Sequence, residues 1–102
     1  MLWNKVTQSA ATPKTEIKIN LEVNTGSGAN SIRAYTASGE TVTSTLTVTC
    51  SVTTIRGTTS TKVTIRSGQS SGSKLYATGE LVSAYIVSGT PLEDSNHYYT
   101  YL

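Results

Sequence analysis

Apolar and polar residues alternate along much of this chain with a period of two, the spacing of a β-strand that buries one face. The clearest example covers residues 16–23, where every second residue is Ile, Leu or Val and the residues between them are Glu, Lys or Asn. A shorter alternating segment, residues 31–36, follows a loop with two glycines and two asparagines at 24–30. Both segments predict strands with one buried and one solvated face.

A longer alternating run covers residues 41–55. Its polar face is mostly threonine and serine, and its apolar face consists of Val42, Leu46, Val48, Cys50 and Val52. Fifteen residues at about 3.3 Å each would span roughly 50 Å, which is too long for one straight strand in a small domain. We therefore expect a bend, a bulge or a change of sheet near Ser44.

The second half of the chain repeats the same pattern in shorter pieces. Residues 56–59 indicate a hairpin turn, from which a strand returns through residues 61–65. A Gly/Ser loop is expected at 67–73, and Leu75 and Ala77 then mark a short strand.

The last third of the chain predicts three more elements. Residues 81–87 are apolar on both faces, which is typical of a central strand covered on both sides. The segment 90–93 has Thr, Pro and Glu at positions that favour one helical turn. Residues 97–102 are expected to form a final strand.

About seven strands, with turn signals every 8–12 residues, predict an all-β chain folded as a single small β-sandwich. An immunoglobulin-like arrangement fits this spacing, with a Greek-key or jelly-roll variant as the alternative. The cysteine pair and core tryptophan of antibody domains are missing. We expect residues 1–14 to be an N-terminal arm and residues 15–102 to be the β-sandwich domain.

Composition changes this picture little. Serine and threonine make up roughly a third of the residues, far above ordinary usage, and threonine favours strands. The net charge is only +2 with 14% charged residues, whereas disorder usually needs a high net charge. The composition therefore favours a folded chain.

The residues that carry chemistry are few and isolated. His97 is the only histidine, Asp94 the only aspartate and Cys50 the only cysteine, and no Gly-x-Ser-x-Gly motif occurs. Nucleophilic catalysis needs a base beside the nucleophile, and calcium loops need several oxygen ligands close in sequence. We expect no enzymatic activity, no cofactor and no metal site, and we interpret Cys50 as a small buried apolar residue.

Charge and hydropathy argue against two classes of partner. The eight Lys and Arg residues are scattered along the chain, whereas nucleic-acid binding usually shows a concentrated basic stripe and a pI above about 9. No apolar run approaches the roughly 18 residues of a membrane span. We therefore expect neither nucleic-acid binding nor a membrane span.

Aromatic residues at the two ends of the chain are the remaining signal. Tyrosine is enriched at protein interfaces, and the residues that we expect to make contacts are Trp3, Tyr98, Tyr99 and Tyr101. If the end of the chain is a strand, Tyr99 and Tyr101 share one face with His97, and that face either closes the core or binds a partner.

These observations favour a non-enzymatic structural or interaction module. It would self-assemble as a homo-oligomer or larger assembly, or dock a protein partner through exposed strand edges. The alternative is a carbohydrate-binding module that uses exposed tyrosine rings. The compartment is left open, with a virion or an extracellular or cell-surface assembly favoured over a cytoplasmic enzyme.

Overall fold

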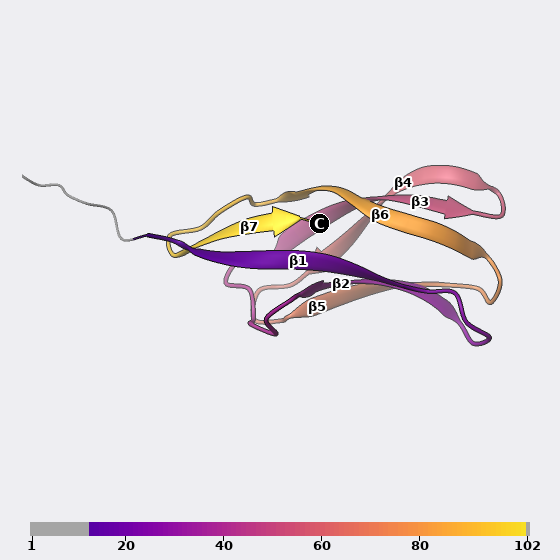
Figure 1. Ribbon diagram of the computed structural model, residues 1–102, viewed down its shortest axis with the longest axis horizontal. Helices are drawn as coiled ribbons and strands as arrows, with labels where there is room; N and C mark the ends of the chain where they lie inside the picture. The colour runs from indigo at the N-terminus through magenta and orange to yellow at the C-terminus, as the bar shows by residue number, and fades with distance from the viewer. Residues whose placement is uncertain (1–12, 102) are drawn as a thin grey trace, which may run out of the picture.

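The computed structural model describes residues 13–101, which form seven strands in two packed sheets and include no helix (Figure 1). The first sheet has the order β5–β2–β1–β7 and the second the order β4–β3–β6. The strands are β1 (Thr15–Asn24), β2 (Asn30–Thr36), β3 (Leu46–Thr54), β4 (Gly57–Ile65), β5 (Ser71–Tyr76), β6 (Leu81–Thr90) and β7 (His97–Tyr101). The predicted all-β sandwich of about seven strands is confirmed.

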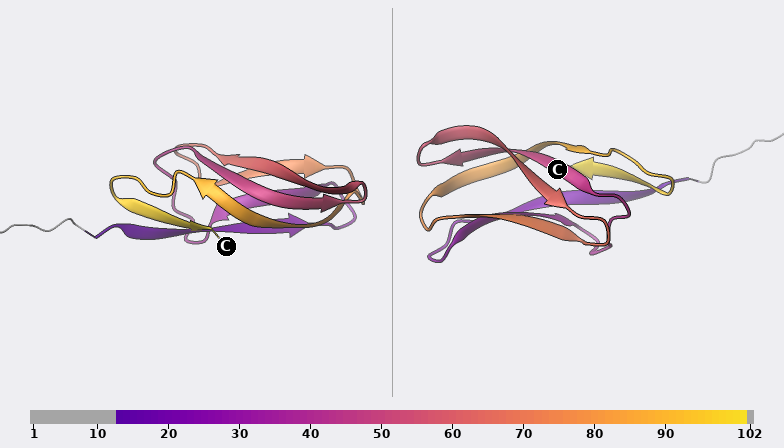
Figure 2. Two further views of the ribbon diagram at one scale, coloured as in Figure 1. Left: turned by 90° about the horizontal axis from the view of Figure 1, so that it is seen from above. Right: turned by 180° about the vertical axis from the view of Figure 1, so that it is seen from behind.

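The chain passes between the two sheets four times. β1 and β2 form a hairpin in one sheet and β3 and β4 a hairpin in the other, after which β5, β6 and β7 alternate between the sheets. Antibody constant domains keep the fourth strand with the first, second and fifth. Here β4 stays beside β3, and β7 joins β1 as the one parallel pair among the described strands. The last strand of the chain therefore forms one edge of the four-stranded sheet (Figure 2).

β1 shows how the alternating pattern becomes a half-buried strand. Ile17 and Ile19 are buried and Lys18 between them is exposed. On the solvated face, Arg33 Nε of β2 donates to Glu22 Oε1 at 2.9 Å. Burying an Ile side chain stabilises the fold by about 1.5–3 kcal/mol, whereas exposed ion pairs contribute less than about 1 kcal/mol. The apolar face therefore determines which side of β1 faces inward.

The alternating run at residues 41–55 is interrupted near Ser44, as its length predicts. β3 begins only at Leu46, and residues 41–45 lie outside every strand. Val42 still reaches the core, and its backbone exchanges hydrogen bonds with the loop that joins β4 to β5, at Gly68 and Gln69. The expected break near Ser44 is confirmed.

The prediction that residues 81–87 form a central, doubly covered strand is wrong. Among the strands of residues 13–101, β6 lies at the edge of its sheet and pairs only with β3. Val82, Tyr85 and Val87 remain exposed, at 56%, 64% and 60% of their surface. β7, the next strand in the chain, pairs with β1, so it leaves the edge of β6 free.

The predicted helical turn at 90–93 is also absent. The carbonyl of Leu92 accepts a hydrogen bond from the Tyr99 backbone, and the Asp94 backbone donates to the carbonyl of His97. These backbone groups pair with β7, so they cannot close a turn of helix.

The short strand predicted around Leu75 exists, but it begins earlier and faces the other way. β5 starts at Ser71, inside the segment expected to be a loop. Its register with β2 places Lys74 opposite Ile32, on the inner face of the sheet, yet at this edge the Lys74 side chain is exposed. Leu75, on the other face, is 73% exposed. The lysine on the inner face is the first sign that the flank between β5 and β4 is polar.

Candidate functional site

The tyrosines predicted to make contacts have different positions in β7. Tyr99 is buried, with 4% of its surface exposed, and its hydroxyl donates to Asp94 Oδ2 at 2.8 Å. The half-buried Tyr101 donates from its hydroxyl to the Pro91 carbonyl at 3.0 Å. Desolvation raises the pKa of Tyr99, and it raises the pKa of Tyr101 to about 12. Both rings therefore belong to the core rather than to an open binding face.

Only one of the four predicted contact residues is exposed on the described surface. Tyr98 points outward from β7 and is 40% exposed. Trp3 lies outside the described residues. A platform of coplanar tyrosines, which the carbohydrate-binding alternative requires, is not formed by Tyr99 and Tyr101.

Asp94 organises the segment between β6 and β7. Its carboxylate accepts hydrogen bonds from the Thr43 and Tyr99 hydroxyls, from the backbone amides of Asn96 and His97, and from the His97 ring. The Thr43 hydrogen bond, together with those from Asn96, Tyr99 and His97, holds the pKa of Asp94 well below its ordinary range despite some desolvation. The hydroxyls of Thr43 and Tyr99 bond to the Asp94 carboxylate rather than to the His97 ring. These contacts therefore fix the segment between β6 and β7.

Residues 13–101 contain no group of three or more His, Cys, Asp or Glu side chains arranged to hold a metal ion. Cys50 is buried in the middle of β3, and desolvation raises the pKa of its thiol. The same residues include no helix long and apolar enough to cross a membrane.

The first feature that could act on another molecule is the free edge of β6. Two register shifts interrupt its pairing with β3, and each leaves one β6 residue without an opposite neighbour. Those residues are Val82 and Val87, and Tyr85 lies between them on the outer face of the sheet, opposite Ser51. We call Val82, Tyr85 and Val87 the β6 apolar edge.

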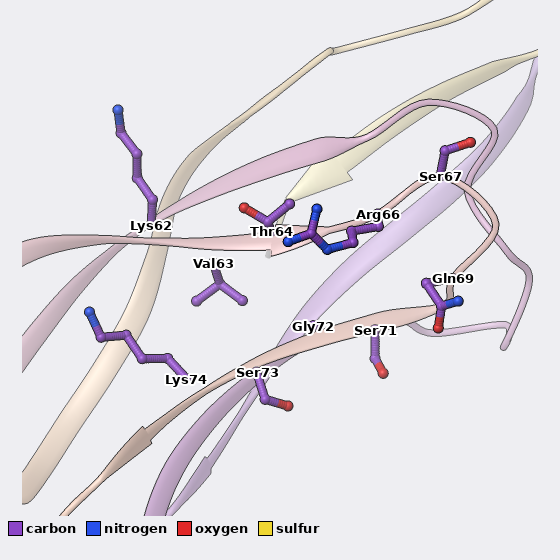
Figure 3. A pocket seen from close by; sticks show the side chains of 10 residues that line it. All are labelled: Lys62, Val63, Thr64, Arg66, Ser67, Gln69, Ser71, Gly72, Ser73 and Lys74. Carbon is purple, nitrogen blue, oxygen red and sulfur yellow. The ribbon is translucent and has the colours of Figure 1, made fainter.

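The second feature is a groove on the opposite flank, between β4 of one sheet and β5 of the other. It has a volume of 520 Å³ and is lined by Lys62, Val63, Thr64, Arg66, Ser67, Gln69, Ser71, Gly72, Ser73 and Lys74. Figure 3 shows Lys62 and Lys74 on the side of the groove away from Ser67 and Gln69, with Arg66 between the two groups. We call this feature the basic groove.

Gly72 determines how closely the walls of the basic groove approach. A Cβ atom at this position would lie 1.9 Å from the carbonyl oxygen of Thr64 on β4. Figure 2 shows β4 and β5 converging toward the turn that joins them. Glycine therefore allows the two sheets to meet here, and the groove opens beyond the contact.

The charge of the basic groove is concentrated and unbalanced. Three of the chain's eight Lys and Arg residues line it with none of its six Asp and Glu, although the whole chain has a net charge of only +2. Within the described range, Lys14, Arg33 and Arg56 form ion pairs with carboxylates, and all three lie outside the groove. An anion entering the groove would meet positive charge that no internal carboxylate offsets.

Comparison of the chain with protein-family models, with curated proteins and with solved structures gave no match. Any role of the β6 apolar edge and the basic groove must therefore be argued from the structure alone. Sequence reasoning described the Lys and Arg residues as scattered and missed this group, because Lys74 lies twelve positions after Lys62 and in the other sheet.

Proposed function

We propose that the domain is a non-enzymatic interaction module that associates with a second copy of itself through the β6 apolar edge. The observation that supports this is the exposure of Val82, Tyr85 and Val87 on an edge strand whose sequence is typical of a covered strand. An unpaired strand edge with apolar side chains is a template for another chain.

The central position of Tyr85 favours a second copy as the partner. Residues directly opposite each other in an antiparallel pair point to the same face of the sheet. A two-fold axis beside Tyr85 therefore places the exposed Tyr85 rings of the two copies opposite each other, with Val82 and Val87 on either side. Such an interface is isologous and closes as a dimer. The bulges confine regular ladder pairing to the residues between the valines, so side-chain burial provides most of the attraction.

The expected dimer is weak. Each copy contributes three side chains that are about 60% exposed, and burying each one further stabilises the pair by about 1–2 kcal/mol. Association costs about 4–15 kcal/mol in lost translational and rotational freedom. The six side chains of a dimer together contribute about 6–12 kcal/mol, which exceeds this cost only near its lower end, so we expect a dissociation constant in the micromolar to millimolar range.

Sedimentation velocity over that concentration range tests the proposal. Val82→Lys and Val87→Lys should each raise the dissociation constant at least about tenfold, because each places a charge within an apolar interface. Leu75→Lys is the matched control, since Leu75 is equally apolar and exposed but lies on β5. Unchanged thermal melts would show that the variants remain folded.

Charge substitution at Tyr85 tests the register. Tyr85→Lys alone places like charges opposite each other at the axis and should weaken the dimer, whereas an equal mixture of Tyr85→Lys and Tyr85→Glu places opposite charges there and should associate more tightly than either variant alone. A wild-type chain that stays monomeric at 1 mM (on the order of the weakest affinity considered), or a mixture no tighter than the separate variants, would refute the β6 pairing.

A further inference from the structure

We infer that the basic groove between β4 and β5 binds an anionic oligosaccharide, a sugar chain that carries sulfate or carboxylate groups. This site is separate from the β6 apolar edge, because β4 and β6 are opposite edges of the same sheet. A result that refutes the proposed dimer therefore does not affect the proposed sugar site, and the reverse also holds.

The first argument is the charge of the groove. Lys62, Arg66 and Lys74 line one opening, and none of the other residues that line it carries a carboxylate. A cleft lined by one sign of charge concentrates ligands of the opposite sign. Arg66 can also hold a sulfate or carboxylate through two parallel hydrogen bonds.

The second argument is the rest of the lining. Hydroxyl and amide side chains surround the cations, namely Thr64, Ser67, Gln69, Ser71 and Ser73. Such groups donate to and accept from sugar hydroxyls. The volume of 520 Å³ lies within the usual range of roughly 300–1,000 Å³ for ligand sites, so a short oligosaccharide segment fits.

The lining also favours a sugar over a nucleic acid. Proteins that bind single-stranded nucleic acids stack the bases on aromatic side chains, and none of the residues that line the groove is aromatic. The chain's pI of 8.8 is also below the value of about 9 and above that is typical of nucleic-acid-binding domains.

Calorimetric titration of the purified chain with four oligomers of equal length tests the site. The probes are a heparin fragment with sulfates and carboxylates, oligogalacturonate with carboxylates only, neutral maltooligosaccharide and oligothymidylate. We expect at least one anionic sugar to bind saturably at least about tenfold more tightly than DNA, and no binding of the neutral sugar. Preference between the two anionic sugars identifies sulfate or carboxylate as the recognised group.

Charge-removing variants locate the binding. Lys62→Gln, Arg66→Gln and Lys74→Gln should each weaken binding about fivefold, the loss of one charge-assisted hydrogen bond of about 1 kcal/mol. Lys18→Gln is the matched control, because Lys18 is an exposed lysine on β1 that does not line the groove. Its affinity for the sugar should stay within about twofold of the wild type. Val82→Lys, which perturbs only the β6 edge, should bind the sugar as the wild-type chain does.

Three outcomes would overturn the inference. They are no binding of either anionic sugar, equally tight binding of DNA, and an equal loss of affinity from Lys18→Gln. The last two would show a general attraction between opposite charges rather than a sugar site.

Discussion

Individual polar residues hold the loops of this sandwich, and each makes several hydrogen bonds. The buried Asn30 donates from its side-chain amide to the carbonyls of Gly26 and Gly28 and accepts from the Leu81 backbone, which ties the β1–β2 loop to the start of β6. Asp94 does the same for the segment before β7. A buried polar group without such partners would cost about 1–3 kcal/mol.

The depressed pKa of Asp94 predicts a pH dependence of stability. An unfolded aspartate titrates near pH 3.9, so the ionised Asp94 stabilises the folded state above about pH 4, and this contribution falls as pH decreases through and below that value. Asp94→Asn should therefore be less stable than the wild type at pH 7, and the difference should shrink on acidification to about pH 2.

Urea unfolding midpoints measured from pH 7 to 2 check this prediction. Glu93→Gln is the control, because Glu93 is adjacent and largely exposed, with a single ion pair to Lys14. A difference between Asp94→Asn and wild type that stays constant over the whole range would contradict the proposed role of the ionised carboxylate.

At the scale of the strand, the close contact of β5 with β4 predicts a specific sensitivity at Gly72. In Gly72→Ala, the added Cβ overlaps the Thr64 carbonyl, and the backbone atoms on both sides cannot move freely. We expect a loss of about 2–3 kcal/mol in the free energy of unfolding, measured by chemical denaturation. In Gly28→Ala the added atom meets open space, so that variant should differ from wild type by less than about 1 kcal/mol. Equal stabilities of the two variants would show that the β4–β5 contact is looser than described.

The sequence predicts a strand correctly where the strand's own alternation determines which face is buried. β1, β2 and β3 bury the faces that their apolar residues mark. β6 was not predictable in the same way, because its apolar sequence does not show which sheet β7 joins or whether another layer packs on its outer face. The free edge of β6 and the exposed Lys74 at the edge of β5 are consequences of strand order, which a local pattern does not contain.

At the scale of the whole molecule, two flanks of one sandwich carry the two proposed sites. The β6 apolar edge borders one flank and the basic groove opens between β4 and β5 on the other. The groove combines residues that the fold brings together from two sheets, whereas the β6 apolar edge lies within one segment whose exposure the sequence does not show. The predicted tyrosine cluster, in contrast, was visible as a motif, and burial of Tyr99 and Tyr101 gives it a structural role.

Cys50 allows the opening of the whole sandwich to be measured. Its thiol is fully buried in β3, the central strand of its sheet. A thiol reagent should therefore label the folded chain only through global unfolding, roughly 10³-fold or more slowly than in concentrated guanidinium chloride. Rapid labelling in buffer would show that β3 becomes accessible by local opening, and the time course of reagent absorbance distinguishes the two cases.

The parallel pairing of β1 with β7 has a mechanical consequence. Thr15 lies opposite His97 and Ile19 opposite Tyr101, so the two strands run in the same direction side by side. Tension applied to the chain before Thr15 and after Tyr101 pulls them along their length in opposite directions. The hydrogen bonds between them then bear the load together, in shear, rather than opening one at a time as in a zipper, so the fold resists stretching along this axis.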